Sequence, residues 1–151
     1  MQAARQPPAH PVPAVLAVVW RGGRVLLVRR ANPPHAGHWG FPGGRLELGE
    51  TLAAAALREL REETGVAAAA RGVVDALDAL TPGADGAPAW HYVLVAVACD
   101  WRAGEPRAGD DALEAGWFDP DALPAPLCPD VAALAERSRP QAPGPAGTGD
   151  A

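Results

Sequence analysis

Three glutamates are spaced so that one helix would bring them together. Glu59, Glu62 and Glu63 stand at i, i+3 and i+4, a spacing that places side chains on one helix face. A merely solvated helix would offset its acids with bases four residues on, whereas Glu59 is followed at that distance by another acid. Carboxylates at this density need a cation, and Mg²⁺ or Mn²⁺ prefers such hard oxygen ligands, usually shared with substrate phosphates. The spacing therefore predicts a metal site for a phosphorylated substrate.

A helix over residues 51–64 is expected to carry these carboxylates. The small apolar residues that would pack its other side against a core are Leu52, Ala55, Ala56 and Leu57. Gly65 stands where a left-handed residue commonly ends a helix. In front of the helix, residues 41–44 (Phe-Pro-Gly-Gly) are predicted to form a glycine-rich turn.

The remaining elements that must support this helix are mostly strands. Residues 14–20 and 24–29 are predicted to be two strands joined by a tight turn at Arg21-Gly22-Gly23. Further strands are expected over residues 90–101 and 116–118, and a second helix over residues 131–137, whereas residues 73–80 are ambiguous by period. Strands combined with one central and one terminal helix predict the α/β class.

Length and composition narrow the class of protein. A chain of 151 residues is expected to form one domain, here residues 13–137, between a flexible Pro/Ala-rich lead-in (1–12) and a disordered Pro/Gly-rich tail (138–151). The net charge of −5 provides no basic field for nucleic acid or anionic membranes. Two cysteines without ligand-like spacing and no long apolar run favour a cytoplasmic protein.

The segment from Gly44 to Val66 resembles the Nudix box, the signature of hydrolases that cleave nucleoside diphosphates linked to another moiety. The fixed positions of that signature are matched by Gly44, Glu50, Arg58, Glu59, Leu60, Glu62, Glu63, Gly65 and Val66. The residues before the box (38–44) and those around Trp117-Phe118-Asp119 are also similar to the family. The resemblance implies a Nudix-type α/β/α sandwich with a mixed sheet, and it favours a strand over residues 73–80.

The resemblance also implies roles for individual residues. The family's metal ligands, with Mg²⁺ or Mn²⁺ as cofactor, correspond to Glu59, Glu62, Glu63 and the backbone carbonyl of Gly43. Arg58 is expected to pair with a glutamate of the box and fix its rotamer. Glu50 is expected either to bind metal through water or to brace the loop before the helix.

The resemblance does not assign the general base or the substrate contacts to single residues. The family uses either a box glutamate or an acid on a later loop, and Asp111 is the first candidate within residues 104–114. Arg29 and Arg45 are candidates for holding phosphate. Candidates for stacking on a nucleobase are Trp39, Phe41, Trp90 and Tyr92, although aromatics in strands more often belong to the core.

The expected activity is metal-dependent hydrolysis of a diphosphate in a small-molecule nucleotide. ADP-ribose or a nucleotide sugar is favoured because Pro82 stands 16 residues after Val66, where a proline accompanies ADP-ribose pyrophosphatases. A nucleoside triphosphate pyrophosphohydrolase is the alternative, and a non-catalytic binding module is more remote because every box carboxylate is present. From the negative net charge, neither a nucleic acid nor a membrane partner is expected, and a homodimer is possible because homodimers are common in the family.

Overall fold

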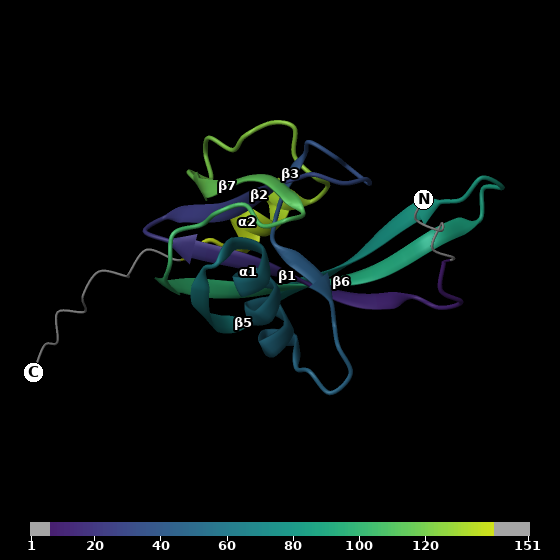
Figure 1. Ribbon diagram of the computed structural model, residues 1–151, viewed down its shortest axis with the longest axis horizontal. Helices are drawn as coiled ribbons and strands as arrows, with labels where there is room; N and C mark the ends of the chain where they lie inside the picture. Colours follow the sequence, from purple (N-terminus) through teal and green to yellow (C-terminus); the bar gives the residue numbers. More distant parts are fainter. Residues whose placement is uncertain (1–6, 141–151) are drawn as a thin grey trace, which may run out of the picture.

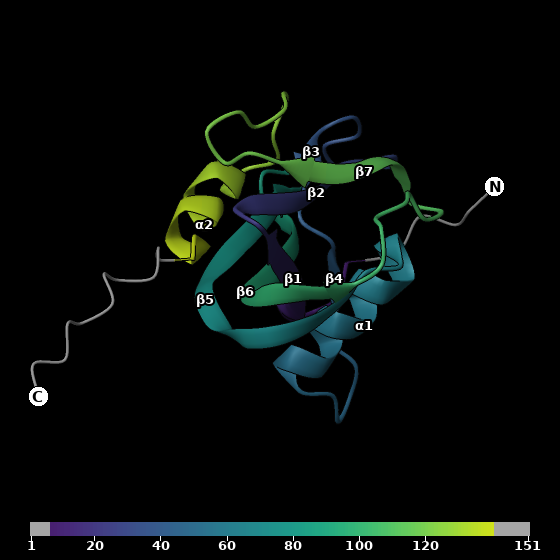
Figure 2. The same ribbon diagram turned by 90° about the vertical axis from the view of Figure 1, so that its left-hand side faces the viewer.

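A mixed seven-stranded sheet separates two helices in the computed structural model, which describes residues 7–140 of the chain (Figure 1). The strands are β1 (Val12–Arg21), β2 (Arg24–Arg30), β3 (Trp39–Gly40), β4 (Gly43–Arg45), β5 (Ala67–Pro82), β6 (Pro88–Ala103) and β7 (Ala112–Phe118). The helices are α1 (Leu52–Thr64) and α2 (Val131–Ser138), and they lie on opposite sides of the sheet (Figure 2). The predicted α/β/α sandwich is confirmed. Most of the predicted lead-in and tail, residues 1–6 and 141–151, lies outside the described residues.

The sheet has the order β3-β2-β1-β6-β5, with β4 paired to β1 and β7 paired to β2. β1 runs parallel to β6, and the other pairs are antiparallel. The predicted turn between the first two strands is present, and Gly22 and Gly23 both have positive φ, as a two-residue hairpin turn requires. β2 and β4 divide one edge of β1: β2 pairs with residues 20–21 and β4 with residues 14–16. This division brings the glycine-rich strand β4 under α1.

Two apolar clusters fill the two sides of the sheet. The cluster under α1 consists of Val15, Ala17, Val19, Leu26, Ala55, Ala56, Leu60, Val66, Val97 and Cys99. The cluster under α2 consists of Val18, Trp20, Val25, Leu27, Phe41, Ala96, Val131, Leu134 and Ala135. Residues of one strand alternate between the clusters, as the two-residue period of a strand requires. Burial of α1 along Ala55, Ala56 and Leu60 directs its glutamates toward β4 and solvent.

Both ends of α1 follow from local sequence. The Thr51 side chain accepts a hydrogen bond from the Ala54 amide at 3.1 Å and caps the N-terminus. Gly65 adopts φ 76°, and its amide bonds to the Arg61 carbonyl, which ends the helix. The predicted helix over residues 51–64 is therefore confirmed to within one residue.

Three segments differ from the sequence-based expectation. Residues 41–44 do not form a free turn, because Gly43 and Gly44 pair with β1 as part of β4. A side chain at Gly43 would collide with the Val15 carbonyl, so glycine here permits close strand approach as well as turning. β5 and β7 begin earlier than expected, at Ala67 and Ala112, because their alanine-rich starts carry no period that marks a strand. Among the described residues, no helix has the length and apolar character needed to span a bilayer.

Candidate metal and phosphate site

The floor of the candidate site is formed by two adjacent glycines of β4. A Cβ on Gly44 would lie 2.5 Å from the carboxylate carbon of Glu59, so the missing side chain makes room for that carboxylate. The Gly43 amide lies 3.3 Å from Oε2 of Glu63 and donates a hydrogen bond to it. Two of the three predicted ligand carboxylates therefore meet the backbone of β4 directly. This contact depends on the pairing of β4 with β1.

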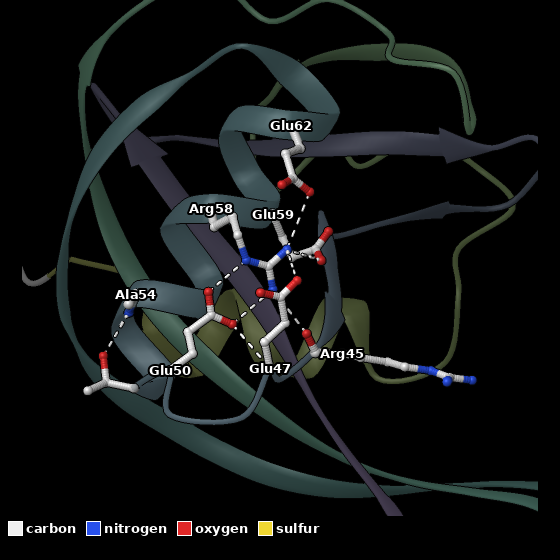
Figure 3. Close-up of polar contacts among 8 residues, drawn as sticks. Arg45, Glu47, Glu50, Ala54, Arg58, Glu59 and Glu62 are labelled. Carbon is white, nitrogen blue, oxygen red and sulfur yellow. Dashed lines mark hydrogen bonds and ion pairs between the residues drawn. The ribbon is translucent and has the colours of Figure 1, made fainter. Parts of the chain in front are cut away.

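Arg58 lies at the centre of the acidic cluster (Figure 3). Its Nε and Nη2 donate to the two carboxylate oxygens of Glu50 at 2.6 and 2.9 Å, in a bidentate pair. Its Nη1 donates to Glu59 at 2.8 Å and to Glu62 at 3.3 Å, and Nη2 also donates to the Arg45 carbonyl at 3.1 Å. The prediction that Arg58 pairs with a box glutamate agrees with this geometry. Of the two roles left open for Glu50, the contacts favour bracing the loop, since its carboxylate also accepts from the Glu47 amide.

The carboxylates differ in their electrostatic environment. The hydrogen bond from Arg58 lowers the pKa of Glu50. Burial raises the pKa of Glu59, although the Arg58 guanidinium opposes that shift. Burial raises the pKa of Glu63 to about 8, and the negative charge of Glu59 adds to the shift. Glu63 is thus a half-buried carboxylate that has a backbone amide, and no arginine, as its hydrogen-bond partner among the described residues. A cation beside it would stabilise its charged form.

The loop between β6 and β7 brings Asp111 towards this cluster. The Asp111 charge raises the pKa of Glu63, so the two carboxylates are close enough to interact. Asp111 is exposed, its backbone carbonyl accepts from the Ala31 amide at 3.1 Å, and its side chain accepts from Asn32 at 3.3 Å. The structure therefore places the predicted general-base candidate at the rim of the site.

Arg30, rather than Arg29, is the arginine beside the carboxylates. The positive charge of Arg30 lowers the pKa of Glu63. Arg29 instead donates to the Gly37 carbonyl at 3.1 Å and pairs with Glu114 at 3.6 Å. Leu27 of the same strand packs on the α2 side, so the alternation along β2 puts Arg29 on that side as well. Arg30 replaces Arg29 as the phosphate-binding candidate, and counting the alternation from Leu26 would have identified it from sequence.

The predicted aromatic contacts also lie on the α2 side of the sheet. Phe41 is buried in the α2 cluster, and Trp39 packs against the same cluster with its ring edge-to-face on Phe118 at 4.9 Å. Both rings are used in packing, so neither offers a free face beside Glu59 and Glu63. The expectation that they stack on a base is not supported by this geometry. The reason is that Trp39 on β3 and Phe41 just after it pack into the α2 cluster.

The Arg45 side chain points away from the box carboxylates (Figure 3). Its guanidinium bonds to the Tyr92 hydroxyl at 3.3 Å and lies 5.6 Å from the centre of the Trp90 ring. Trp90 and Tyr92 are stacked, with centroids 5.8 Å apart and planes 6° from parallel. Arg45 therefore joins the site through its backbone carbonyl, while its side chain extends an aromatic pair on β6.

The donor set fits a hard divalent cation. It offers carboxylates of graded burial, with the side chain of Glu59 15% exposed and that of Glu62 59% exposed. The missing Cβ at Gly44 leaves space against Glu59, and within the described part of the chain Glu63 forms no ion pair. Within residues 7–140, no three His, Cys, Asp or Glu side chains converge as a ready ligand set. Binding would therefore require Glu59 and Glu62 to turn from the Arg58 guanidinium toward the ion.

Comparisons with known proteins agree with this arrangement. The profile of the NUDIX domain matches residues 10–139. An ADP-ribose pyrophosphatase of Methanocaldococcus jannaschii is 36% identical over 115 residues, which cover 76% of this chain and 66% of that protein. A putative 8-oxo-dGTP diphosphatase 2 of Mycobacterium tuberculosis is 40% identical over 97 residues, covering 64% and 65%. The crystal structure of a MutT NUDIX hydrolase from Burkholderia pseudomallei has a TM-score of 0.75 at 33% identity, covering 85% of this chain and 98% of that one.

Proposed function

The chain belongs to the NUDIX family of hydrolases acting on pyrophosphate bonds, and from that premise we propose that it hydrolyses the diphosphate of a nucleoside diphosphate linked to another group. The single observation that carries the proposal is the contact of Glu59 and Glu63 with Gly44 and Gly43. This contact sets two carboxylates beside a strand that has no side chains at that point. A cation held by these carboxylates would lie beside β4 and would take diphosphate oxygens as its remaining ligands.

Each residue of the site has a distinct part in the proposal. Glu59, Glu62 and Glu63 hold the divalent ion that the family generally uses, with Mg²⁺ or Mn²⁺ as the ion suited to these ligands. When bound, such an ion neutralises the diphosphate oxygens and makes the attacking water more acidic. Arg58 holds Glu50 and Glu59 in place, and Arg30 binds phosphate oxygens next to Glu63.

The proton of the attacking water passes to a carboxylate of the site. Asp111 is exposed at the rim and has no arginine partner among the described contacts, so its carboxylate is open to a water molecule bound in the site. A glutamate of the box is the competing base, because such a carboxylate already lies where the ion binds. We assign the base to Asp111, since Glu59, Glu62 and Glu63 are needed as ligands.

ADP-ribose is the favoured substrate. It is supported by the name of the Methanocaldococcus relative and by the position of Pro82, which ends β5. A nucleoside triphosphate is the second candidate, because the Mycobacterium relative carries the name of an 8-oxo-dGTP diphosphatase.

A substrate panel separates these candidates. The purified protein is incubated with ADP-ribose, nucleotide sugars, 8-oxo-dGTP and the ordinary deoxynucleoside triphosphates, with Mg²⁺ or with excess EDTA, and products are separated by chromatography. The proposal requires conversion of ADP-ribose and water into AMP and ribose 5-phosphate, and its loss in EDTA. Release of pyrophosphate from a triphosphate as the faster reaction would move the assignment to the second candidate. Equal turnover with EDTA would contradict the metal mechanism.

A further inference from the structure

The loop between β6 and β7 is docked onto the C-terminal end of α1. The last carbonyl groups of a helix lack partners within the helix itself. Here the Gly109 amide donates to the Glu63 carbonyl at 2.9 Å, and the Arg107 amide donates to the Thr64 carbonyl at 3.1 Å. Glu63, whose half-buried carboxylate meets the Gly43 amide, is therefore also held by its own backbone carbonyl.

Glycine is needed at the contact between the loop and Glu63. A Cβ on Gly109 would lie 2.8 Å from the Glu63 carbonyl oxygen, 3.3 Å from its carbonyl carbon and 3.4 Å from the Glu62 carbonyl oxygen. All three atoms belong to the backbone of α1, so no side-chain rotation can relieve the collision. Either the loop must lift or the last turn of α1 must move.

The loop is fixed on both sides of this contact. At its start, the Trp101 indole donates to the Gly104 carbonyl at 2.8 Å, and Arg21 pairs with Glu105 at 2.8 Å. At its end, Asp111 accepts from the Ala31 amide. Because the loop is anchored at both ends, a bulge at Gly109 is transmitted to α1 instead of being absorbed in free chain.

We propose that Gly109 is a positioning residue, which sets the height of the Glu63 carboxylate over β4 by bringing the loop amide onto the Glu63 carbonyl. The inference rests on the proposed role of Glu63 as a metal ligand. The last turn of α1 is then positioned by residues outside the box, through main-chain contact from the β6–β7 loop. An Arg107 side-chain effect on the helix terminus is a different explanation, since that guanidinium lies 3.4 Å from the Cβ position of Gly65.

Metal affinity tests the proposal without relying on turnover. Mn²⁺ binding to the metal-free protein is measured by titration for Gly109→Ala, with Gly116→Ala as the matched control, because a Cβ there makes only ordinary contact at 3.7 Å with Phe118. Outer residues that orient metal ligands typically change affinity by 10- to 100-fold, so Gly109→Ala should weaken Mn²⁺ binding at least about tenfold. Gly116→Ala and Arg107→Ala should bind as the wild type does. The proposal is overturned if Gly109→Ala changes the Mn²⁺ affinity by less than about threefold, or if Arg107→Ala weakens Mn²⁺ binding as much as Gly109→Ala does.

A double-mutant cycle identifies the residue through which Gly109 acts. If it acts through Glu63, adding Gly109→Ala to Glu63→Gln should weaken Mn²⁺ binding little beyond Glu63→Gln alone. Additive losses would show that Gly109 acts elsewhere, which contradicts the proposal. A Glu63→Gln variant with unchanged Mn²⁺ binding and turnover would instead contradict the proposed function itself.

Hydrogen exchange in the wild-type, metal-free protein covers the case in which Gly109→Ala does not fold. The amides of Arg107 and Gly109 donate hydrogen bonds to α1, whereas the intervening Ala108 amide donates none to that helix within the described residues. The docked loop requires the first two amides to exchange more slowly than the third. Exchange of all three at one fast rate would mean that the loop does not hold α1 in solution.

Discussion

Replacing Gly44 by alanine should separate the geometry of the site from the stability of the fold. The added Cβ would lie 2.5 Å from both the carboxylate carbon and Oε1 of Glu59, whereas ordinary contacts begin at 3.4 Å. The Glu59 carboxylate must therefore move by about 1 Å, and a misplacement of that size in a catalytic constellation can cost about a hundredfold. At 1.36 kcal/mol per decade, this corresponds to about 2.7 kcal/mol of transition-state stabilisation.

The same substitution should cost the fold little. The atoms in collision are the end of a flexible side chain, and Gly44 does not have the positive φ that disfavours alanine. We expect the free energy of unfolding to change by no more than about 1 kcal/mol. Gly43→Ala provides the contrast, because the added Cβ would collide with the Val15 backbone. This substitution should therefore lower the melting temperature strongly.

The assay is Mg²⁺-dependent hydrolysis of ADP-ribose, with thermal unfolding measured on the same samples. A kcat for Gly44→Ala within about threefold of wild type would refute the argument, because the Glu59 carboxylate would then not need the space that the missing Cβ of Gly44 leaves. Loss of folding in Gly44→Ala would refute it differently, by showing that the collision is not confined to a movable side chain. Glu59→Gln should lose activity to a similar or greater extent.

Three further outcomes follow from the same site. Burial raises the pKa of Glu63 from 4.5 to about 8, so the folded, metal-free protein keeps a proton that the unfolded chain releases. Its unfolding free energy, measured with denaturant, should fall as pH rises from 4.5 towards 8, and Glu63→Gln should reduce that slope to the part that the raised pKa of Glu59 supplies. Asp111→Asn should lower kcat by about a hundredfold or more with Mn²⁺ affinity unchanged, and Glu114→Gln is its control. If both substitutions had equally small effects on kcat, the loop would not carry the general base. Steady-state kinetics should show a higher KM for Arg30→Ala than for Arg29→Ala, and the reverse order would restore the original assignment.

The main elements were predictable because their signals are local. The Gly22-Gly23 turn, the Thr51 cap and Gly65 each act within a few residues, so the hairpin and α1 could be located from sequence. The extents of β5 and β7 were not predictable, because their alanine-rich starts have no period and are fixed by pairing with β6 and β2. The strand character of Gly43 and Gly44 was missed for the same reason, since it depends on contact with β1.

The sequence by itself determined the chemistry of the site, because helical spacing alone places Glu59, Glu62 and Glu63 on one face. Which other residues join them was decided by the tertiary structure. The side of the sheet on which Arg29 and Arg30 lie depends on the register of β2 against its neighbours, and one residue of register exchanges the two faces. The docking of Gly109 on Glu63 likewise joins positions far apart in the chain, and no local pattern encodes such a contact.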